Sequence, residues 1–242
     1  MTNTNIDTAF IFAAGFGERM LPITLHTPKP MVGVLGKKVI EYCFENINRA
    51  RFIKNVVVNT HHLAEVIEPY LVACGYPNFK IKISAEKEIL ETAGGIINAL
   101  QLIGPKPFFT INGDIIWQDK IGNILEKLKD NFDETKDDIL MLLVPKEKAI
   151  GYHGKGDFSL KDDGAIYKSE DNKYVYTGIQ IIKPRLFFGY EVKPMSLRVI
   201  YEAKKQSDGC YKSIRGLVYD GTWLHVGTVA DIAKAEEFLL QL

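Results

Sequence analysis

The chain has 242 residues, of which 46% are hydrophobic and 25% are charged, an ordinary composition for a globular protein. Thirty Lys and Arg residues balance thirty Asp and Glu residues, so the sequence provides no overall field for binding nucleic acid or an anionic membrane. No apolar run is long enough to span a membrane, and the N-terminal sequence MTNTNIDT lacks the features of a signal peptide. The three cysteines are scattered and form neither a metal motif nor a disulfide set. We therefore expect a cytoplasmic protein.

Strands and helices alternate through the first 145 residues. Residues 8–14 form a continuous apolar run, which is typical of a strand buried on both faces. Apolar residues at helical spacing predict helices at 37–50, 63–71, 92–103 and 121–132. Further strands are predicted at 55–59, 81–85, 107–112 and 138–144. This alternation predicts a parallel sheet with helices on both faces.

The pattern changes after Pro145. Residues 150–184 and 209–228 hold short alternating runs broken by Gly and Asp, which predict antiparallel hairpins. A last helix is predicted from Thr228, which forms a capping box with Asp231. We therefore predict one α/β domain over residues 1–242, Rossmann-like and doubly wound, with a mostly parallel sheet. Its parts are a first half (about 1–145), an antiparallel extension (about 146–227) and a C-terminal helix (228–242).

The loop after the first strand is rich in glycine and reads Ala14-Gly15-Phe16-Gly17-Glu18-Arg19. Ligands of open parallel sheets bind past the carboxyl ends of the strands, and glycines let backbone amides approach a polyphosphate closely. The loop is not a dinucleotide fingerprint, because Met20 stands in place of the third glycine, and no Gly-Lys-Ser/Thr of a P-loop follows. Arg19, and Lys29 between two prolines, add cations to the loop. This pattern predicts a nucleoside triphosphate that is attacked at its α-phosphate; the alternative is a tight turn without a ligand.

Asp114 follows a buried strand that reads "TING" at its end. A carboxylate at the ligand side of such a sheet suits Mg²⁺, which prefers hard oxygen ligands and usually bridges one or two carboxylates to phosphates. The ion would offset charge on the α-phosphate during displacement. We predict that Asp114 binds a divalent metal; the alternative is a turn or cap residue.

The segment FAAGFGERMLPITLHTPKPMVGVLGKKVIEY resembles the sugar-1-phosphate nucleotidyltransferases. The segments ETAGGI, INGDI, YHGKGDF, YTGIQIIKPRLF and GTWLHVGTVADIAKAE resemble later blocks of that family, so the likeness covers nearly the whole chain. LHTPKP and HGKGDF favour the short bacterial branch of N-acetylmuramate-1-phosphate uridylyltransferases. Short mannose-1-phosphate and heptose-1-phosphate guanylyltransferases are similar as well.

The resemblance implies that an NTP and a sugar 1-phosphate give an NDP-sugar and pyrophosphate. It favours UTP with N-acetylmuramate 1-phosphate in cell-wall sugar metabolism; the alternative is GTP with mannose 1-phosphate or a heptose 1-phosphate. The first half would bind the nucleotide and the extension would bind the sugar. These two substrates are the expected partners, without nucleic acid or membrane, and the sequence does not distinguish a monomer from a dimer.

The resemblance also assigns residues to the site. Arg19, Lys29 and Asp114 would be catalytic. The nucleotide would be bound by the six residues of the glycine loop together with Gly94, Gly95 and Asn112. The sugar phosphate would be bound by Lys155, Asp157, Thr177 and Gly178. We expect Glu86, which precedes the ETAGGI segment, to be an exposed acid; the alternative is that it faces the pocket.

His225 departs from the family pattern, which commonly has an Asp at this position. With Asp114 it would complete the metal site, and because imidazole suits manganese better than magnesium, Mn²⁺ is an alternative to Mg²⁺. Alternatively, His225 only makes a hydrogen bond in the pocket. The departure also favours a second class of function, a nucleotide-sugar-binding regulatory protein with impaired catalysis.

Overall fold

The computed structural model describes residues 5–241; residues 1–4 of the polar N-terminal segment and Leu242 of the predicted last helix lie outside this range. Strands and helices alternate in the first half as predicted. The elements are β1 (Thr8–Phe12), β2 (Gly33–Val34), β3 (Lys37–Lys38), α1 (Val39–Ala50), β4 (Asn55–Thr60), α2 (Ala64–Ala73), β5 (Lys80–Ala85), α3 (Glu91–Ile103), β6 (Phe108–Asn112), β7 (Ile115–Gln118), α4 (Ile124–Asn131) and β8 (Ile139–Pro145).

The second half holds short strands and two helices. They are β9 (Ala149–Ile150), β10 (Ser159–Leu160), β11 (Ala165–Tyr167), β12 (Tyr174–Ile182), α5 (Leu197–Glu202), β13 (Cys210–Val218), β14 (Thr222–His225) and α6 (Val229–Leu239). Short 3₁₀ helices include η1 (Glu18–Met20) and η3 (Lys29–Met31) in the glycine-loop region and η5 (Pro184–Phe187) before α5.

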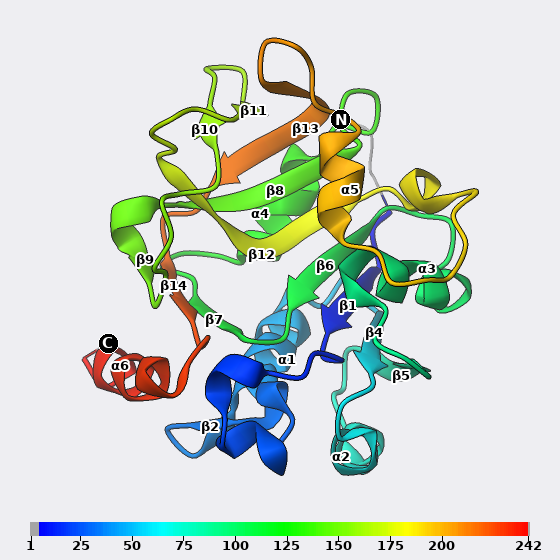
Figure 1. Cartoon of the computed structure of the whole chain (residues 1–242), viewed down its shortest axis with the longest axis vertical. Helices are drawn as coiled ribbons and strands as arrows, with labels where there is room; N and C mark the ends of the chain where they lie inside the picture. The colour runs from blue at the N-terminus through cyan, green and yellow to red at the C-terminus, as the bar shows by residue number, and fades with distance from the viewer. Residues whose placement is uncertain (1–4, 242) are drawn as a thin grey trace.

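One nine-stranded sheet runs through both halves in the order β10-β11-β13-β8-β12-β6-β1-β4-β5 (Figure 1). The pairs β6-β1, β1-β4, β4-β5 and β13-β8 are parallel. Strand β12 is antiparallel to both of its neighbours, β6 and β8, and β11 is antiparallel to β13 and β10. The sheet is therefore mostly parallel as predicted, since only β12 and β11 run opposite to the other strands.

Helices cover both faces of this sheet, which confirms the doubly wound architecture. Along β1, Ala9 and Ile11 pack into the hydrophobic core that holds α1, α2 and α4, whereas Phe10 packs into the core that holds α3 and α5. The continuous apolar run of the first strand reflects these two buried faces, since successive strand residues point to opposite sides.

A second sheet of three strands has the order β7-β14-β9. Strand β14 is antiparallel to β7, with His225 opposite Ile115, and parallel to β9. Neither β7 nor α5 was expected from the sequence. Helix α6 begins after the N-cap Thr228, whose capping box with Asp231 forms as predicted, and it packs beside β2 (Figure 1).

Three predictions of local structure were wrong. The helix predicted from residue 121 begins at Ile124, because the Asn123 side chain caps it by accepting hydrogen bonds from the amides of residues 125 and 126; Ile121 lies outside and is 83% exposed. Residues 150–184 do not form hairpins alone, since β12 inserts between β6 and β8 and thereby joins the two halves of the chain. Residues 209–228 do not form a hairpin, since β13 runs parallel to β8 whereas β14 pairs with β7 and β9 in the second sheet.

At the amino end of β8, a buried acidic residue is surrounded by cations. The carboxylate of Asp138 forms ion pairs with Lys183, Arg185 and Lys204. Burial raises the pKa of this carboxyl, but hydrogen bonds from Lys204 and Arg185 outweigh that effect and hold the pKa below its usual value. Because β8 runs in the same direction as β1, this cluster stabilises the end of the sheet away from the carboxyl ends of the strands.

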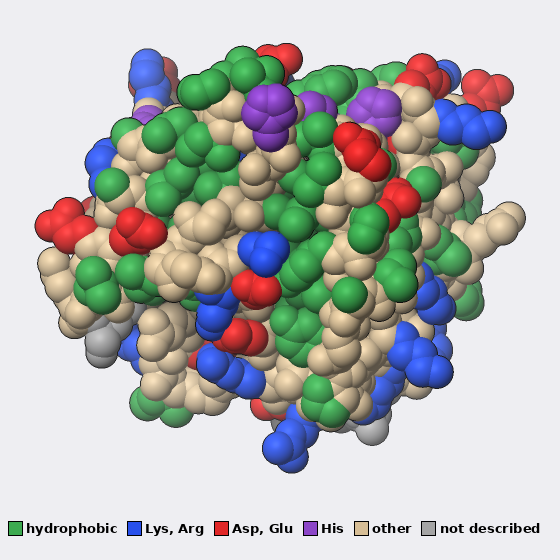
Figure 2. All heavy atoms as spheres, turned by 90° about the horizontal axis from the view of Figure 1, so that it is seen from below, with side chains coloured by type: hydrophobic (Ala, Val, Ile, Leu, Met, Phe, Trp, Pro, Cys, Tyr) green, Lys and Arg blue, Asp and Glu red, His purple; other side chains and the backbone are tan. Residues whose placement is uncertain are grey.

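The face of the molecule seen in Figure 2 carries acidic and basic side chains in mixture rather than in separate fields, in keeping with the balanced charge of the chain. Among residues 5–241, no helix combines the length and the apolar composition needed to cross a bilayer.

Candidate active site

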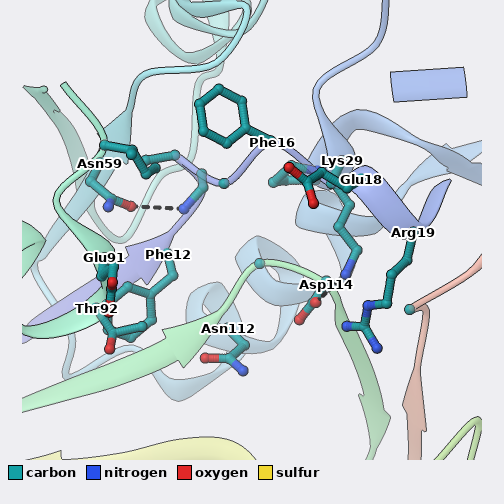
Figure 3. A pocket seen from close by; sticks show the side chains of 18 residues that line it. Phe12, Phe16, Glu18, Arg19, Lys29, Asn59, Glu91, Thr92, Asn112 and Asp114 are labelled. Carbon is teal, nitrogen blue, oxygen red and sulfur yellow. Dashed lines mark hydrogen bonds and ion pairs between the residues drawn. The ribbon is translucent and has the colours of Figure 1, made fainter. Parts of the chain in front are cut away.

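A cavity of about 640 Å³ lies at the carboxyl ends of β1 and β6 (Figure 3). All six residues of the glycine loop line it, as do Lys29, Asn112 and Asp114. The structure therefore brings together residues that lie about a hundred positions apart in the sequence, at the edge of the sheet where the sequence predicted a ligand. A volume of this size is within the range of small-molecule sites.

The glycine loop has its backbone donors free. Within residues 5–241, the amides of residues 15–18 donate no hydrogen bond. Gly17 adopts a φ of 66°, and a Cβ atom there would lie 2.8 Å from Cγ2 of Thr24, so another residue would be strained in its backbone and too close to its neighbour. The Thr24 hydroxyl donates to the Gly17 carbonyl oxygen, at 3.0 Å, and holds the loop in this shape. Free amides on a fixed loop are suited to bind phosphate oxygens.

Lys29, Asp114 and His225 meet at one side of the cavity. The Lys29 Nζ lies 2.5 Å from Asp114 Oδ2, and His225 Nε2 lies 3.3 Å from the same oxygen. The three side chains are 13%, 21% and 20% exposed. Arg19 lies on this side too, and its exposed side chain makes no hydrogen bond to the described residues 5–241 (Figure 3). This side of the cavity therefore has two cationic side chains that could contact phosphates.

Asp114 is held as a carboxylate by its neighbours. Burial alone raises its pKa, but the hydrogen bond from His225 and the charge of Lys29 outweigh burial and lower the pKa far below its usual value. Its other oxygen, Oδ1, is buried and has no partner within the described residues. A buried carboxylate oxygen without a partner, on a residue that lines the cavity, fits a divalent cation.

The ligand set from the protein would be small. Residues 5–241 contain no group of three or more His, Cys, Asp and Glu side chains that could hold a metal ion. Asp114 and His225 can therefore supply at most part of a coordination shell, and phosphate oxygens and water would have to supply the rest. This is the arrangement that Mg²⁺ usually adopts at nucleotide sites.

Pairing between β7 and β14 places His225 beside Asp114. The amide of Val226 donates to the Asp114 carbonyl oxygen at 2.9 Å, which fixes the end of β14 next to the site. A Cβ atom on Gly227 would lie 2.6 Å from Cε1 of His225, so glycine is needed here to leave room for the imidazole ring. The ring also stacks on Trp223, with centroids 6.2 Å apart. The position of His225 is thus determined by the second sheet.

The opposite wall of the cavity holds residues that the sequence analysis missed. Asn59 at the end of β4 lines the cavity, and its Oδ1 accepts a hydrogen bond from the Ala13 amide at 2.7 Å (Figure 3). Glu91 and Thr92 at the start of α3 line it as well. The available signal was positional, because Asn59 ends a buried strand in the way that Asn112 does.

Gly94 and Gly95, predicted to contact the nucleotide, lie within α3 and do not line the cavity. A Cβ atom on Gly94 would lie 2.3 Å from the carbonyl oxygen of Lys193, and one on Gly95 would lie 2.7 Å from Oε1 of Glu86. Both glycines allow α3 to pack closely against neighbouring segments. Their contact with a nucleotide stays a prediction.

Glu86 is 7% exposed, so the expectation of an exposed acid was wrong. It follows β5 directly and its side chain turns inward. It accepts hydrogen bonds from Asn59 and from the amide of Leu90, which compensate for part of the cost of burying a carboxylate.

The four predicted sugar-phosphate residues lie outside the lining of the 640 Å³ cavity. Lys155 is exposed. Asp157 accepts hydrogen bonds from the Tyr152 hydroxyl and the Tyr176 amide. Thr177 is fully buried and donates to the carbonyl oxygen of residue 142, and Gly178 lies against the side chain of Asn112. Asp157 and Thr177 therefore have structural partners, and their role in sugar binding stays a prediction.

The sequence matches the model of the nucleotidyl transferase family over residues 8–241. It is 32% identical, over 90% of this chain and 91% of the relative, to an N-acetylmuramate alpha-1-phosphate uridylyltransferase from Caulobacter vibrioides. A protein of the same name from Neisseria meningitidis serogroup B is 30% identical, over 94% of this chain and 96% of the relative. A mannose-1-phosphate guanyltransferase from Hypocrea jecorina is 26% identical, over 91% of this chain and 61% of the relative.

Solved structures share the fold. HddC from Yersinia pseudotuberculosis, crystallised with GMP-PN, aligns with a TM-score of 0.76 over 97% of this chain and all of that one, at 20% identity. The inositol-1-phosphate CTP transferase from T. maritima aligns with a TM-score of 0.72 over 97% of this chain and 98% of that one, at 16% identity. These likenesses confirm the predicted fold class.

Proposed function

Because the chain belongs to the nucleotidyl transferase family, we propose that it transfers a uridylyl group from UTP to N-acetylmuramate 1-phosphate. The observation that carries this choice is the match, along more than nine-tenths of their length, to two N-acetylmuramate alpha-1-phosphate uridylyltransferases. The cavity supports the reaction class, since it combines free loop amides, cationic side chains and a carboxylate at the carboxyl ends of the parallel strands.

In the proposed reaction, a phosphate oxygen of the sugar 1-phosphate attacks the α-phosphorus of UTP. A new P–O bond forms as the bond from the α-phosphorus to the bridging oxygen of the β-phosphate breaks. The products are UDP-N-acetylmuramate and pyrophosphate, which carries away the electron pair of the broken bond. The substrate brings its own anionic nucleophile, so the protein needs to position the reactants and neutralise charge.

The residues of the cavity would divide this work. The amides of the glycine loop would bind the triphosphate, and Arg19 and Lys29 would neutralise the departing pyrophosphate. Asn112, at the end of β6, would contact the nucleotide. The candidates on the sugar side, where β12 joins the two halves of the sheet, remain Lys155, Asp157, Thr177 and Gly178.

Enzymes of this family generally use a divalent metal. We propose that Asp114 and His225 would hold Mg²⁺, or Mn²⁺ as the alternative, together with phosphate oxygens and water. When bound, the ion would offset negative charge on the phosphates. In the structure Lys29 Nζ pairs with Oδ2 of Asp114, so this lysine would have to leave that oxygen, or share it, when an ion binds.

A second candidate within the same chemistry is transfer of a guanylyl group to mannose 1-phosphate or a heptose 1-phosphate. The guanyltransferase relative and the structural neighbour crystallised with GMP-PN favour it. A candidate of another class is a nucleotide-sugar-binding regulatory protein, which His225 favours.

Pyrophosphate release tests these candidates. UTP and GTP are each paired with N-acetylmuramate 1-phosphate and with mannose 1-phosphate, in Mg²⁺ and in Mn²⁺. We expect turnover with UTP and N-acetylmuramate 1-phosphate. Turnover only with GTP and mannose 1-phosphate would assign the second candidate. No turnover with any pair, restored by His225→Asp, would indicate the regulatory protein, and no turnover in either protein would refute the proposal.

A further inference from the structure

Glu86 is a buried carboxylate that the proposed reaction does not use. Its Oε1 accepts a hydrogen bond from Asn59 Nδ2 at 2.7 Å, and its Oε2 accepts one from the Leu90 amide at 3.1 Å. Glu86 is 7% exposed, Asn59 2% and Leu90 4%. A carboxylate is expensive to bury, so the place of Glu86 beside Asn59, which lines the cavity, requires an explanation.

Hydrogen bonds through Glu86 connect the two segments that form one end of the cavity. From the glycine-loop side, the Ala13 amide donates to Asn59 Oδ1 at 2.7 Å, and Asn59 donates in turn to Glu86. From the helix side, the Leu90 amide donates to Glu86 just before α3 begins. The chain of bonds therefore runs from the loop after β1, through the end of β4, to the start of α3.

The hydrogen bonds determine which side-chain type is needed at Glu86 and at Asn59. Glu86 faces two N–H donors, so both of its side-chain oxygens must accept, and only a carboxylate provides two acceptors. Asn59 must accept from one side and donate to the other, which an amide does. A Cβ atom on Gly95 would lie 2.7 Å from Glu86 Oε1 and 2.9 Å from Asn59 Nδ2, so α3 packs directly onto this pair.

The backbone of Glu86 is fixed as well. Its amide donates to the Thr60 carbonyl oxygen at 2.8 Å, and its carbonyl oxygen lies 3.0 Å from Nδ1 of His61. Since a carbonyl oxygen can only accept, His61 carries a proton on Nδ1. The adjacent His62 lies 2.8 Å, through Nε2, from the carbonyl oxygen of Thr24 in the glycine-loop region. The amide and the carbonyl oxygen of Glu86 are thus both held to the end of β4.

We propose that Glu86 is a positioning residue for the nucleotide, which acts through Asn59 and Leu90 to hold the loop after β1 and the start of α3, the two segments at one end of the cavity, at a fixed separation before the nucleotide binds. Asn59 lies across the cavity from Lys29 and Asp114 (Figure 3). The effect is therefore expected on nucleotide affinity rather than on the displacement at the α-phosphate. Preorganised walls lower the cost of ordering the site on binding.

Glu86→Gln tests the inference with a change of one atom. Glutamine has one acceptor oxygen, so its NH₂ group must face either Asn59 Nδ2 or the Leu90 amide, donor against donor. We expect the Kd for UTP, measured by calorimetry, to rise about tenfold to a hundredfold. The matched control is Glu88→Gln, an exposed residue two positions further on, for which we expect a change within about twofold.

A reciprocal double variant separates this role from a loss of folding. In Asn59→Asp/Glu86→Gln, the new Asp accepts from the Ala13 amide and from the Gln NH₂ group, and the Gln oxygen accepts from the Leu90 amide. All three hydrogen bonds can then form again at unchanged net charge. We expect the double variant to bind UTP at least about fivefold more tightly than Glu86→Gln, with positive coupling in a double-mutant cycle.

The inference rests on the proposed function because it assumes that a nucleotide binds in this cavity. The binding assay, however, does not depend on turnover. Unchanged UTP affinity in Glu86→Gln would overturn the inference, as would a double variant no better than Glu86→Gln. A loss confined to kcat, with nucleotide affinity intact, would overturn it too. If the wild-type protein binds neither UTP nor GTP, both proposals fail. If it binds without turnover, only the proposed function fails, and the affinities of the variants still decide the inference.

Discussion

Replacing Lys29 by Met should increase the affinity of the free protein for a divalent cation. In the structure the lysine and a cation would compete for the same carboxylate, because Lys29 Nζ lies 2.5 Å from Asp114 Oδ2. Removing the ammonium removes the competitor. Asp114 Oδ1 then has no partner, and Oδ2 keeps only its contact with His225. The variant should therefore bind metal without a nucleotide more tightly than the wild-type protein does.

The size of the effect follows from the geometry. Two unit charges 2.5 Å apart attract by about 1.7 kcal/mol at the dielectric constant of water and by about 6.6 kcal/mol at an effective constant of 20. Both side chains are less than a quarter exposed, but desolvation and side-chain entropy oppose much of this attraction. A net competition of about 1–3 kcal/mol corresponds to a tightening of roughly fivefold to 150-fold.

Paramagnetic titration of Mn²⁺ measures this affinity without any reaction. The matched control is Lys37→Met, which breaks a surface ion pair with Glu45 and should leave Mn²⁺ binding unchanged. In the same variant of Lys29, kcat/KM should fall by about a hundredfold or more, because a cation facing the phosphates is lost. Unchanged or weaker Mn²⁺ binding in Lys29→Met would refute the competition, whatever happens to turnover.

Three further predictions concern the second sheet and the far end of the first. Gly227→Ala should displace the His225 ring and lower kcat/KM roughly tenfold to a hundredfold. The control Gly75→Ala should leave kcat/KM unchanged, because a Cβ atom there meets nothing within 4 Å. Equal kcat/KM in the two variants would argue against the close contact at Gly227. His225→Asp should lower the ratio of turnover in Mn²⁺ to turnover in Mg²⁺, measured as pyrophosphate release, because it replaces a nitrogen ligand by oxygen; an unchanged ratio would count against His225 as a ligand. Asp138→Asn should cost about 1–3 kcal/mol of unfolding free energy at pH 7, measured in urea, because Lys204 and the other cations lose their partner. Since the folded pKa of Asp138 is lowered, its contribution to stability is present above the ordinary carboxyl pKa and is lost as the pH falls through the folded pKa. The difference in unfolding free energy between variant and wild type should therefore shrink as the pH is lowered below the ordinary carboxyl pKa; a constant difference would contradict the role of the charge.

Much of the site could be predicted because its signals are local. The glycine loop follows a strand whose burial on both faces is visible as an unbroken apolar run, and the end of such a strand is where a parallel sheet binds ligands. Asn112 and Asp114 follow a second run of this kind. Parallel neighbours present their carboxyl ends at one edge, so the meeting of Lys29 with Asp114 follows from local patterns and general rules of topology.

Other parts of the site depend on contacts that local patterns do not encode. His225 reaches Asp114 only because β14 pairs with β7, and a strand of four residues directly after a turn gives little periodicity to detect. The burial of Glu86 depends on donors from Asn59 and Leu90, which lie on two other elements. A charged residue in a polar segment is normally solvated, so only the tertiary arrangement could reveal that this one is enclosed.

The position of β12 has a consequence for how the protein can move. This strand is hydrogen-bonded to β6 of the nucleotide half on one side and to β8 on the other, so both halves of the molecule share one continuous ladder of backbone hydrogen bonds. Rotating one half against the other would break those bonds, which makes rigid-body hinge closure costly. Enclosure of two substrates would therefore be left to the surface segments around the cavity, and the time needed for product release would depend on the opening of short loops rather than on the reorientation of lobes.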